Sequence, residues 1–590
     1  MDKSRRRFLD LSSASIISAA LPASSEARQQ QSSMDTGNFL HGVASGDPLS
    51  DQVIIWTRVS AQAEPKFIRT RFELALDKAF LNPVQTGYVK ALKERDYTIK
   101  IDLQGLQENC VYYYRFSTAN AVSVVGRTRT LATQRDKLTF AVFSCANYTA
   151  GYFNVYHDAC QHQQNIDAVI HLGDYLYEYG MLDSNARPAY ATQNATAIGR
   201  ELPAGNEREL FSLADYRKRY ALYRSDPDLQ QIHQLYPFIC IWDDHEIADN
   251  TSQKSAQDRW INQTACCYTR KMAAVQAYYE WLPVRMPVHT SSDHIYRSFH
   301  YGSLFSLYML DSRLSARTPA LDYADYQQPD GQLNVNAFMT DISNDTLQML
   351  GTQQLDWLQA ELEKSGAAWQ IIAQQVRVSE NPIPLEIIQL ALQYRSQNGA
   401  QKSATKQQIV QAFEQASQIM ARLQLQDHTL CADQIERVKT LLPYNLDAWD
   451  GYPQARKRLY QLIKKNNRPT LLLSGDAHYA WSNLLQDDSA DTLAIELGVS
   501  SVSAPGVEED FAIDDPALLL QLEQASPLFN PRSLYSNFKD RGYLILQIEQ
   551  QEVKAHWRYV NNITSRNYQS LPQRNHLLRI AYKNGRYYYR

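Results

Sequence analysis

The sequence has few of the features that define several other classes of protein. No apolar run in its 590 residues is long enough to cross a bilayer, which takes about 20 helical residues. The seven cysteines are odd in number and irregularly spaced, so they do not indicate a disulfide framework. A formal net charge of −4 provides no broad basic surface for nucleic acid. A serine-nucleophile motif of the type Gly-x-Ser-x-Gly is also missing.

The N-terminus is expected to carry an export signal. Ser4-Arg5-Arg6-Arg7-Phe8-Leu9 resembles a twin-arginine motif, and a weakly apolar stretch, 11–21, follows it. A short amphipathic anchor is the alternative. We predict a signal segment over 1–33, the twin-arginine translocation machinery as a partner, and no stable membrane anchor after processing. The mature protein is then expected in the periplasm or outside the cell.

Four apolar, strand-type stretches end in polar side chains. They are 140–147, 168–178, 238–246 and 470–478, and they lead into Ser-Cys-Ala-Asn, Gly-Asp-Tyr, Asp-Asp-His-Glu and Gly-Asp-Ala-His. Open α/β sheets place their sites at the carboxyl ends of such strands. Carboxylates, imidazoles and thiols that converge there suit two or more metal ions, which clamp a phosphoryl group. Polar caps on an ordinary α/β protein explain one such stretch but not four together.

These motifs resemble the metallophosphoesterase signature in its PhoD-like (alkaline phosphatase D) variant. In that variant a Cys replaces the usual first Asp, Asp-Asp-His-Glu replaces Gly-Asn-His-Asp/Glu, and Gly-Asp-x-His replaces Gly-His-x-His. The resemblance covers nearly the whole mature chain and includes 216–220, 226–230, 278–285, 310–313, 447–453 and 541–543. It implies a layered metallophosphoesterase-type α/β sandwich, preceded by an N-terminal all-β immunoglobulin-like sandwich.

The resemblance also implies Fe³⁺ and Ca²⁺ as cofactors, with other divalent metals as alternatives. Cys145 and Tyr177 resemble the thiolate and phenolate ligands of a ferric ion; from the residues alone, a buried thiol and a hydrogen-bonded tyrosine are the alternatives. Asp174 can bridge two cations through its two oxygens, and Asp244 is expected at the second ion. Asp476 and His478 share a turn and can both face the cleft. The predicted metal ligands are therefore Cys145, Asp174, Tyr177, Asp244, Asp476 and His478.

Three further residues are assigned to catalysis and substrate. His245 follows a predicted ligand, and we expect it to act as the acid that protonates the leaving alkoxide. A further metal ligand is the alternative role for His245. Asn147 is expected to contact substrate through its amide. Arg313 is expected to bind phosphate bidentately, and an Arg that pairs with carboxylates at a strand end is the alternative.

Together these residues predict a secreted, metal-dependent phosphoester hydrolase. A metal-activated hydroxide attacks phosphorus in line, without a covalent enzyme intermediate. The substrate is a small or polymeric phosphoester, either a monoester or a diester. One alternative is a phosphodiesterase specific for phospholipid or a cell-wall polymer, and another is a non-catalytic extracellular binding protein with a structural metal site.

The chain is predicted to divide into two folded parts after the signal. Short strands of period two over 38–133 indicate a separate all-β sandwich. Alternating strands and helices over 136–590 indicate the catalytic α/β part, with core strands within 167–174, 237–244, 304–311, 369–376 and 470–476. The stretch 181–205 lacks periodicity and is expected to be a loop near the cleft.

An insertion over 382–440 departs from the family pattern. It is rich in Gln and Ala, and apolar residues spaced as in 409, 413, 419 and 423 indicate amphipathic helices. Such a segment is either a surface excursion or a lid over the site. Near the C-terminus, Asn584-Gly585 predicts a closing hairpin.

Overall fold

The computed structural model describes residues 36–61, 63–162, 165–252, 264–286, 294–397, 399–510, 513 and 515–590. The predicted signal segment, 1–33, lies outside these residues. Within them, no helix combines the length and the hydropathy of a membrane span.

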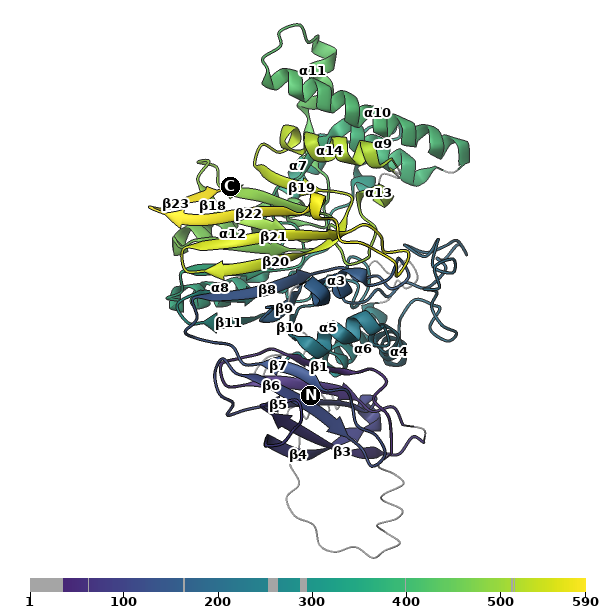
Figure 1. Ribbon diagram of the computed structural model, residues 1–590. Helices are drawn as coiled ribbons and strands as arrows, with labels where there is room; N and C mark the ends of the chain where they lie inside the picture. The colour runs from purple at the N-terminus through teal and green to yellow at the C-terminus, as the bar shows by residue number, and fades with distance from the viewer. Residues whose placement is uncertain are drawn as a thin grey trace, which may run out of the picture.

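Two large sheets form the centre of the molecule (Figure 1). The ten-stranded sheet has the spatial order β23 (Arg586–Tyr589), β22 (His576–Lys583), β21 (Glu552–Val560), β20 (Arg541–Glu549), β8 (Lys137–Phe143), β9 (Ala168–His171), β10 (Pro237–Cys240), β1 (Val43–Gly46), β2 (Val53–Arg58) and β5 (Thr98–Leu103). The seven-stranded sheet has the order β11 (Arg297–Tyr301), β12 (Phe305–Met309), β13 (Trp369–Ala373), β16 (Thr470–Ser474), β18 (Thr492–Gly498), β17 (Ala480–Gln486) and β19 (Ser533–Asn537). The five predicted core strands are thus confirmed as β9, β10, β12, β13 and β16.

The two sheets pack against each other through one apolar core. Phe140 of β8 meets Phe305 of β12 edge to face, with ring centroids 5.5 Å apart. In the first sheet β8, β9 and β10 are parallel, and in the second β12, β13, β16 and β18 are parallel. Parallel strands are buried on both faces, which explains why these stretches read as continuous apolar runs. Their carboxyl ends point to the same edge of the core, where the site lies.

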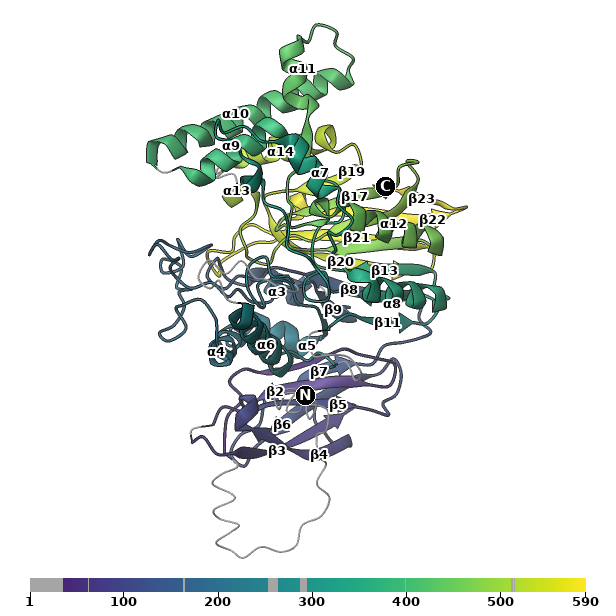
Figure 2. The same ribbon diagram turned by 180° about the vertical axis from the view of Figure 1, so that it is seen from behind.

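Helices cover the outer faces of both sheets (Figures 1 and 2). The first sheet is covered by α3 (Asn154–His162), α4 (Leu213–Arg224), α5 (Pro227–Leu235) and α6 (Thr264–Trp281), whose buried side chains join the same core. The second is covered by α8 (Gly351–Lys364) and α12 (Pro453–Asn466). Among the described residues, this part also contains a helix α7 (Val335–Ile342) and the short 3₁₀ turns Tyr323–Tyr326, Trp449–Gly451 and Pro572–Arg574, whereas a further 3₁₀ turn, Lys93–Arg95, precedes β5. The predicted layered α/β fold is confirmed.

The N-terminal part is a β-sandwich that shares a strand pairing with the catalytic sheet. Its outer sheet has the order β4 (Pro83–Leu92), β3 (Phe67–Ala75), β6 (Val111–Ser117) and β7 (Gly126–Arg129), and it packs on β1, β2 and β5 through a core of its own. The sequence predicted a separate all-β unit. In the structure, however, β1 pairs in parallel with β10, with Ser45 opposite Pro237. Without this pairing, β1 would be an edge strand whose buried backbone groups lack hydrogen-bond partners. The pairing satisfies these groups and couples the sandwich to the sheet that carries the site.

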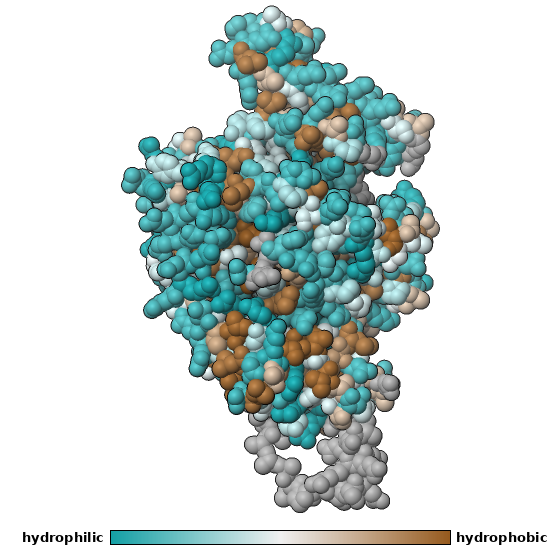
Figure 3. Space-filling view, in the orientation of Figure 1, coloured by the Kyte–Doolittle hydropathy of each residue, from teal (hydrophilic) through white to brown (hydrophobic). Residues whose placement is uncertain are grey.

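The surface of the sandwich carries exposed apolar side chains. Leu81 and Val122 are 77% and 62% exposed, and Figure 3 shows brown areas over this part of the molecule. The remainder of the visible face is largely polar (Figure 3).

The insertion forms the predicted helices and packs on the catalytic part. Strands β14 (Pro382–Pro384) and β15 (Leu441–Pro443) pair at its base. Between them lie α9 (Leu385–Ser396), α10 (Gly399–Gln424) and α11 (Ala432–Lys439), and α10 also contacts α14 (Pro516–Phe529). Buried residues of α9 and α10 share a core with Trp481 and with Val507 of α13 (Val507–Asp510). The insertion is therefore anchored by apolar packing and projects at one end of the molecule (Figure 1).

Two smaller predictions are also confirmed. Residues 181–205 form turns and an isolated bridge, without a helix or a longer strand. Strands β22 and β23 form the closing hairpin, with Asn584 and Gly585 both at positive φ, 52° and 75°. This is the backbone that a two-residue turn of the Asn-Gly type requires.

Candidate active site

The candidate site is built from loops that follow five parallel strands. Cys145 follows β8, Asp174 follows β9 and Asp244 follows β10. Asp476 and His478 follow β16, and Arg313 follows β12. Backbone hydrogen bonds link the loops, because the amide of Cys145 donates to Gly173 and that of Ala146 donates to Asp174. Residues far apart in the sequence are thereby fixed side by side.

Four of the predicted ligands have a left-handed backbone. The φ angles are 60° at Cys145, 53° at Asp174, 64° at Asp476 and 61° at His478. Such a conformation costs a non-glycine residue roughly 1–2 kcal/mol and persists where the surrounding structure imposes it. Only glycine fits at position 173, where φ is 104°, because a Cβ there would lie 2.5 Å from the amide nitrogen of Asp243. The backbone at these strand ends is therefore held in an unfavourable conformation, which sets the direction of the side chains of the predicted ligands.

A first group of donors contains a thiol, a carboxylate, an imidazole and a phenol. Cys145, Asp174 and His478 each offer a ligand atom within 4.8 Å of the other two. The hydroxyl of Tyr177 lies 3.1 Å from Oδ2 of Asp174 and 3.0 Å from Nε2 of His478. Burial lowers the pKa of His478 to about 3, so the imidazole is neutral and can serve as a ligand. Burial also raises the pKa of the Cys145 thiol and of the Tyr177 phenol.

A second group joins His245 to two carboxylates. Asp174, Asp244 and His245 again offer atoms within 4.8 Å of one another. Nδ1 of His245 lies 2.8 Å from Oε2 of Glu178, and the ring stacks on Tyr177 at 4.1 Å between centroids. Burial alone lowers the pKa of His245, but the carboxylates of Asp244, Glu178 and Asp174 outweigh it and raise this pKa well above its usual range. A protonated imidazole at this position can donate a proton to a leaving group.

A third group consists of carboxylates around one buried arginine. Asp243, Asp244 and Asp476 offer oxygens within 4.8 Å of one another. The guanidinium of Arg313 is fully buried; it pairs with Asp243, lies 3.3 Å from Asp476 and 3.5 Å from Asp244, and binds Asp447 at 2.5 Å. A buried carboxylate cluster of this density needs positive charge to stay ionised. Arg313 supplies one such charge, and bound cations can supply the rest.

Orphaned oxygens show that the residues fit metal ions. Oδ1 of Asp174, Oδ2 of Asp243 and Oδ1 of Asp244 are buried and accept no hydrogen bond from any residue that the structure describes, although Oδ1 of Asp244 lies 3.5 Å from the guanidinium of Arg313. Burial of a carboxylate oxygen without a hydrogen bond is expensive. All three lie in the same cluster, together with neutral imidazole, thiol and phenol donors. Hard oxygen ligands suit Ca²⁺, and the anionic thiolate and phenolate suit a more highly charged ion.

Comparison with known proteins identifies the family. A family model described as PhoD-like phosphatase matches residues 140–557, and a model of its N-terminal domain matches residues 23–132. The chain belongs to the PhoD-like phosphatase family. It is 30% identical to alkaline phosphatase D of Bacillus subtilis over 542 residues, which cover 89% of this chain and 78% of that protein. A solved structure described as PhoD superposes with a TM-score of 0.68 at 26% identity, over 95% of this chain and 92% of the other. The protein is therefore a phosphoric ester hydrolase of a metal-dependent family, and the non-catalytic alternative is set aside.

The structure of this PhoD-like phosphatase separates two residues that the sequence placed together. Asp476 and His478 were expected to face the cleft from one turn. Because both have positive φ, the turn sends Asp476 to the carboxylates around Arg313 and His478 to Cys145 and Asp174. Each residue therefore belongs to a different donor group.

The two predicted substrate contacts are engaged by the protein itself. Oδ1 of Asn147 accepts hydrogen bonds from the amides of Thr149 and Ala150 at 3.0 and 3.3 Å and from the Thr149 hydroxyl at 2.8 Å. Arg313 is held by four carboxylates, which favours its alternative role as a structural ion-pair partner. Substrate contact by Asn147, through its amide nitrogen, stays a prediction.

Two residues important to the site were given no role from the sequence. Glu178 orients His245, and its other oxygen accepts a hydrogen bond from the amide of Asp249 at 2.7 Å. Glu246 accepts hydrogen bonds from the amides of Asp174, Tyr175 and Asp243 at 3.0, 2.6 and 2.8 Å and so ties two ligand loops together. Both belong to motifs visible in the sequence, but only the fold shows which way their side chains point.

Proposed function

We propose that this phosphoester hydrolase works outside the cytoplasm with Fe³⁺ and Ca²⁺ as cofactors, and that water attacks phosphorus directly and in line. Export through the twin-arginine machinery is part of this proposal, supported by Arg5, Arg6 and Arg7 and the short apolar stretch after them. The observation that carries the metal assignment is the set of three orphaned carboxylate oxygens on Asp174, Asp243 and Asp244.

The two kinds of donor indicate which residues hold which ion. Cys145, Tyr177, Asp174 and His478 form the set suited to Fe³⁺, because thiolate and phenolate are strongly donating anions. Asp243, Asp244 and Asp476 form the all-carboxylate set suited to Ca²⁺. When bound, such ions supply Lewis acidity, which polarises phosphoryl oxygens and lowers the pKa of a water molecule.

The chain's own residues supply proton transfer and charge balance. Glu178 accepts a hydrogen bond from Nδ1 of His245, which leaves Nε2 to carry a proton for the leaving oxygen. Arg313 neutralises part of the charge of Asp243, Asp447 and Asp476 and keeps their carboxylates in place. No covalent intermediate is needed in this scheme.

Elemental analysis combined with turnover tests the proposal. Protein purified without chelator is expected to contain iron and calcium and to hydrolyse chromogenic phosphomonoesters, phosphodiesters or both. Chelation should abolish activity, and adding back Fe³⁺ and Ca²⁺ together, but neither alone, should restore it. Asp491→Asn, which removes an exposed carboxylate far from these donors, is the matched control for variants at the ligands. Full activity without either metal would overturn the cofactor assignment.

The same assays distinguish the substrate classes. A panel of monoesters, simple diesters, phospholipids and polymeric phosphodiesters measures the relative kcat/KM. Cell fractionation of the double variant Arg5→Lys/Arg6→Lys, compared with the unaltered signal, tests the route of export.

A further inference from the structure

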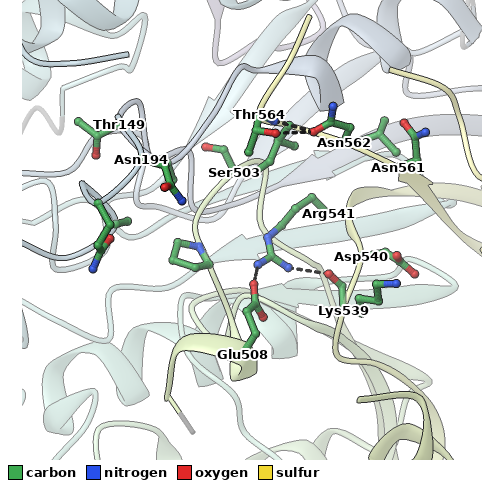
Figure 4. A pocket seen from close by; sticks show the side chains of 16 residues that line it. Thr149, Asn194, Ser503, Glu508, Lys539, Asp540, Arg541, Asn561, Asn562 and Thr564 are labelled. Carbon is green, nitrogen blue, oxygen red and sulfur yellow. Dashed lines mark hydrogen bonds and ion pairs between the residues drawn. The ribbon is translucent and has the colours of Figure 1, made fainter. Parts of the chain in front are cut away.

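A cavity of about 360 Å³ lies beside the first donor group. Its walls come from five segments that are distant in the sequence: Thr149 and Ala150 after β8, the loop 181–205, the segment 503–508, the turn before β20 and the turn after β21. Figure 4 shows Asn194, Ser503, Arg541 and Asn562 around it. This cavity contains none of the predicted metal ligands, so it is distinct from the metal cluster.

Hydrogen bonds connect the cavity wall to a predicted ligand. Nδ1 of His478 lies 2.5 Å from the carbonyl oxygen of Pro505 and 3.2 Å from the hydroxyl of Tyr190. The Tyr190 hydroxyl also donates to Pro505 at 3.0 Å. Pro505 lines the cavity, so only one side chain separates the cavity from the ion-binding atoms. The cavity is therefore within a short distance of the alcohol part of a phosphoester bound at the ions.

Arg541 is the cation at the boundary between cavity and cluster. It is 8% exposed, pairs with Glu508, and donates to the carbonyl of Lys539 at 2.9 Å (Figure 4). Its Nε and the Oε2 of Glu508 have no hydrogen-bond partner among the residues that the structure describes. Arg313 is surrounded by four carboxylates, whereas Arg541 pairs with one, which is half-buried on the short helix α13. Arg541 is the better placed of the two to exchange its partner for a ligand anion.

The rest of the wall adds a second cation and neutral hydrogen-bonding groups. Lys539 lines the cavity with an exposed side chain. Asp540 adds little negative charge, because its carboxylate is taken by Arg574 at 2.5 Å and by Asn537 at 3.0 Å. The other polar lining is mainly amides and hydroxyls, such as Asn194 and Thr564. Once Glu508 is displaced, two cations face a cavity lined by neutral groups.

We propose that this cavity binds the leaving alcohol of the phosphoester and selects alcohols that carry a second anionic group, a phosphate or a carboxylate. Arg541 and Lys539 bind that anion, and Glu508 occupies its position in the free enzyme. The inference rests on the proposed function, because it takes the reacting phosphoryl group to sit at the ions. Charge-assisted hydrogen bonds from a buried guanidinium provide the selectivity.

Three small phosphoesters of similar size test the inference. Glycerol 3-phosphate has an uncharged alcohol, 3-phosphoglycerate adds a carboxylate, and propane-1,3-diol bisphosphate adds a phosphate. Each is measured as a competitive inhibitor of a chromogenic ester, so the test does not depend on whether monoesters or diesters are turned over. The wild-type enzyme should bind one or both anionic compounds about tenfold more tightly than glycerol 3-phosphate. The stronger of the two identifies the preferred anion.

Variants at the three charged residues should change this preference in different directions. Arg541→Gln should reduce it to about twofold or less, and Lys539→Met by about threefold. Glu508→Gln should increase it, because the competing carboxylate is lost. Lys583→Met, in the exposed β22–β23 hairpin, is the matched control for Lys539→Met. High salt should weaken the preference in the wild type, which a purely structural role of Arg541 does not predict.

Two results would overturn the inference. One is a wild-type enzyme that turns over the chromogenic ester but shows no preference for the anionic compounds. The other is an Arg541→Gln variant that keeps the wild-type preference for the anionic compounds. If that variant does not fold, an unchanged preference in both Lys539→Met and Glu508→Gln would also overturn the inference. Absence of turnover with both metals present would instead contradict the proposed function.

Discussion

Oε2 of Glu178 lies 2.8 Å from Nδ1 of His245, and both side chains are buried at the edge of the metal-binding cluster. Glu178 follows β9 by seven residues and His245 follows β10 by five, so the contact depends on the pairing of these two strands. The carboxylate fixes the ring orientation and stabilises the imidazolium. This relationship makes the two possible roles of His245, acid and ligand, separable by experiment.

Replacement of His245 by Ala should slow turnover while leaving most of the metal bound. Loss of a general acid costs of order 10²–10⁴ in kcat. Glu178→Gln should give a smaller loss, because it keeps the hydrogen bond but not the charge, and it should shift the alkaline limb of the pH–rate profile to lower pH. A metal-free His245→Ala protein, found by elemental analysis, would instead make His245 a ligand.

Substitution of Asp174 should affect more than one ion. Asp174 belongs to the group with Cys145 and to the group with Asp244, whereas Asp476 belongs only to the carboxylate group. Asp174→Asn should therefore lower both iron and calcium content and abolish activity. Asp476→Asn should lower calcium alone. Elemental analysis of the two variants side by side decides, and an Asp174→Asn protein that lacks only one of the two metals would rule out the bridging role.

The colour of the protein tests the iron ligands. Thiolate and phenolate bound to Fe³⁺ donate charge to the metal in visible light, whereas calcium alone leaves a protein colourless. The Tyr177 hydroxyl lies among the atoms of Asp174 and His478, so it is placed to be such a ligand. Tyr177→Phe should lose or shift the visible band and retain less iron while remaining folded by circular dichroism.

A fully active, colourless wild-type preparation without iron would contradict the assignments of both Cys145 and Tyr177. It would leave the assignments of Asp174 and Asp244 intact, because these rest on the orphaned oxygens.

The sequence was most informative where one local pattern determines the structure. The stretches that became β8, β9, β10 and β16 are buried on both faces, and this produces the apolar runs that predicted them. The helices of the insertion and the Asn584-Gly585 hairpin also follow from local periodicity and turn chemistry.

The features that could not be predicted from the sequence depend on contacts between segments that are distant along the chain. Apolar periodicity does not show that β1 pairs with β10, since the packing of the whole sheet determines which strands pair. It also does not show that Arg313 meets Asp447, 134 residues later. Asp476 and His478 enter two different donor groups from a turn with two left-handed residues, and nothing in a Gly-Asp-Ala-His motif specifies this backbone.

Packing of the insertion predicts how stability responds to mutation within it. Ile409 and Phe413 of α10 are buried in the core that contains Trp481. Truncating buried residues of this size costs about 2–5 kcal/mol, so Ile409→Ala and Phe413→Ala should lower the urea midpoint of unfolding. Leu425→Ala, at a position 81% exposed, is the control and should change stability little. An unaffected midpoint in both core variants would show that the insertion unfolds independently of the catalytic part.

The last prediction concerns acid stability and His41, which lies far from the metal cluster. His41 is 8% exposed and packs edge to face on Trp281, with Nδ1 3.5 Å from a guanidinium nitrogen of Arg58. Burial, assisted by the charges of Arg58 and Arg224, lowers its pKa from 6.5 to about 3.

The unfolded chain therefore binds a proton at His41 below pH 6.5 while the folded chain does not. The stability that this histidine contributes is complete above pH 6.5 and is lost as the pH falls toward 3. At pH 5 the loss amounts to about 2 kcal/mol. In urea unfolding at pH 7.5 and pH 5.0, His41→Gln should reduce the difference in unfolding free energy between the two pH values by about this amount, whatever its effect at either pH alone. A wild-type and a His41→Gln protein with the same pH dependence would show that His41 is not buried as a neutral imidazole.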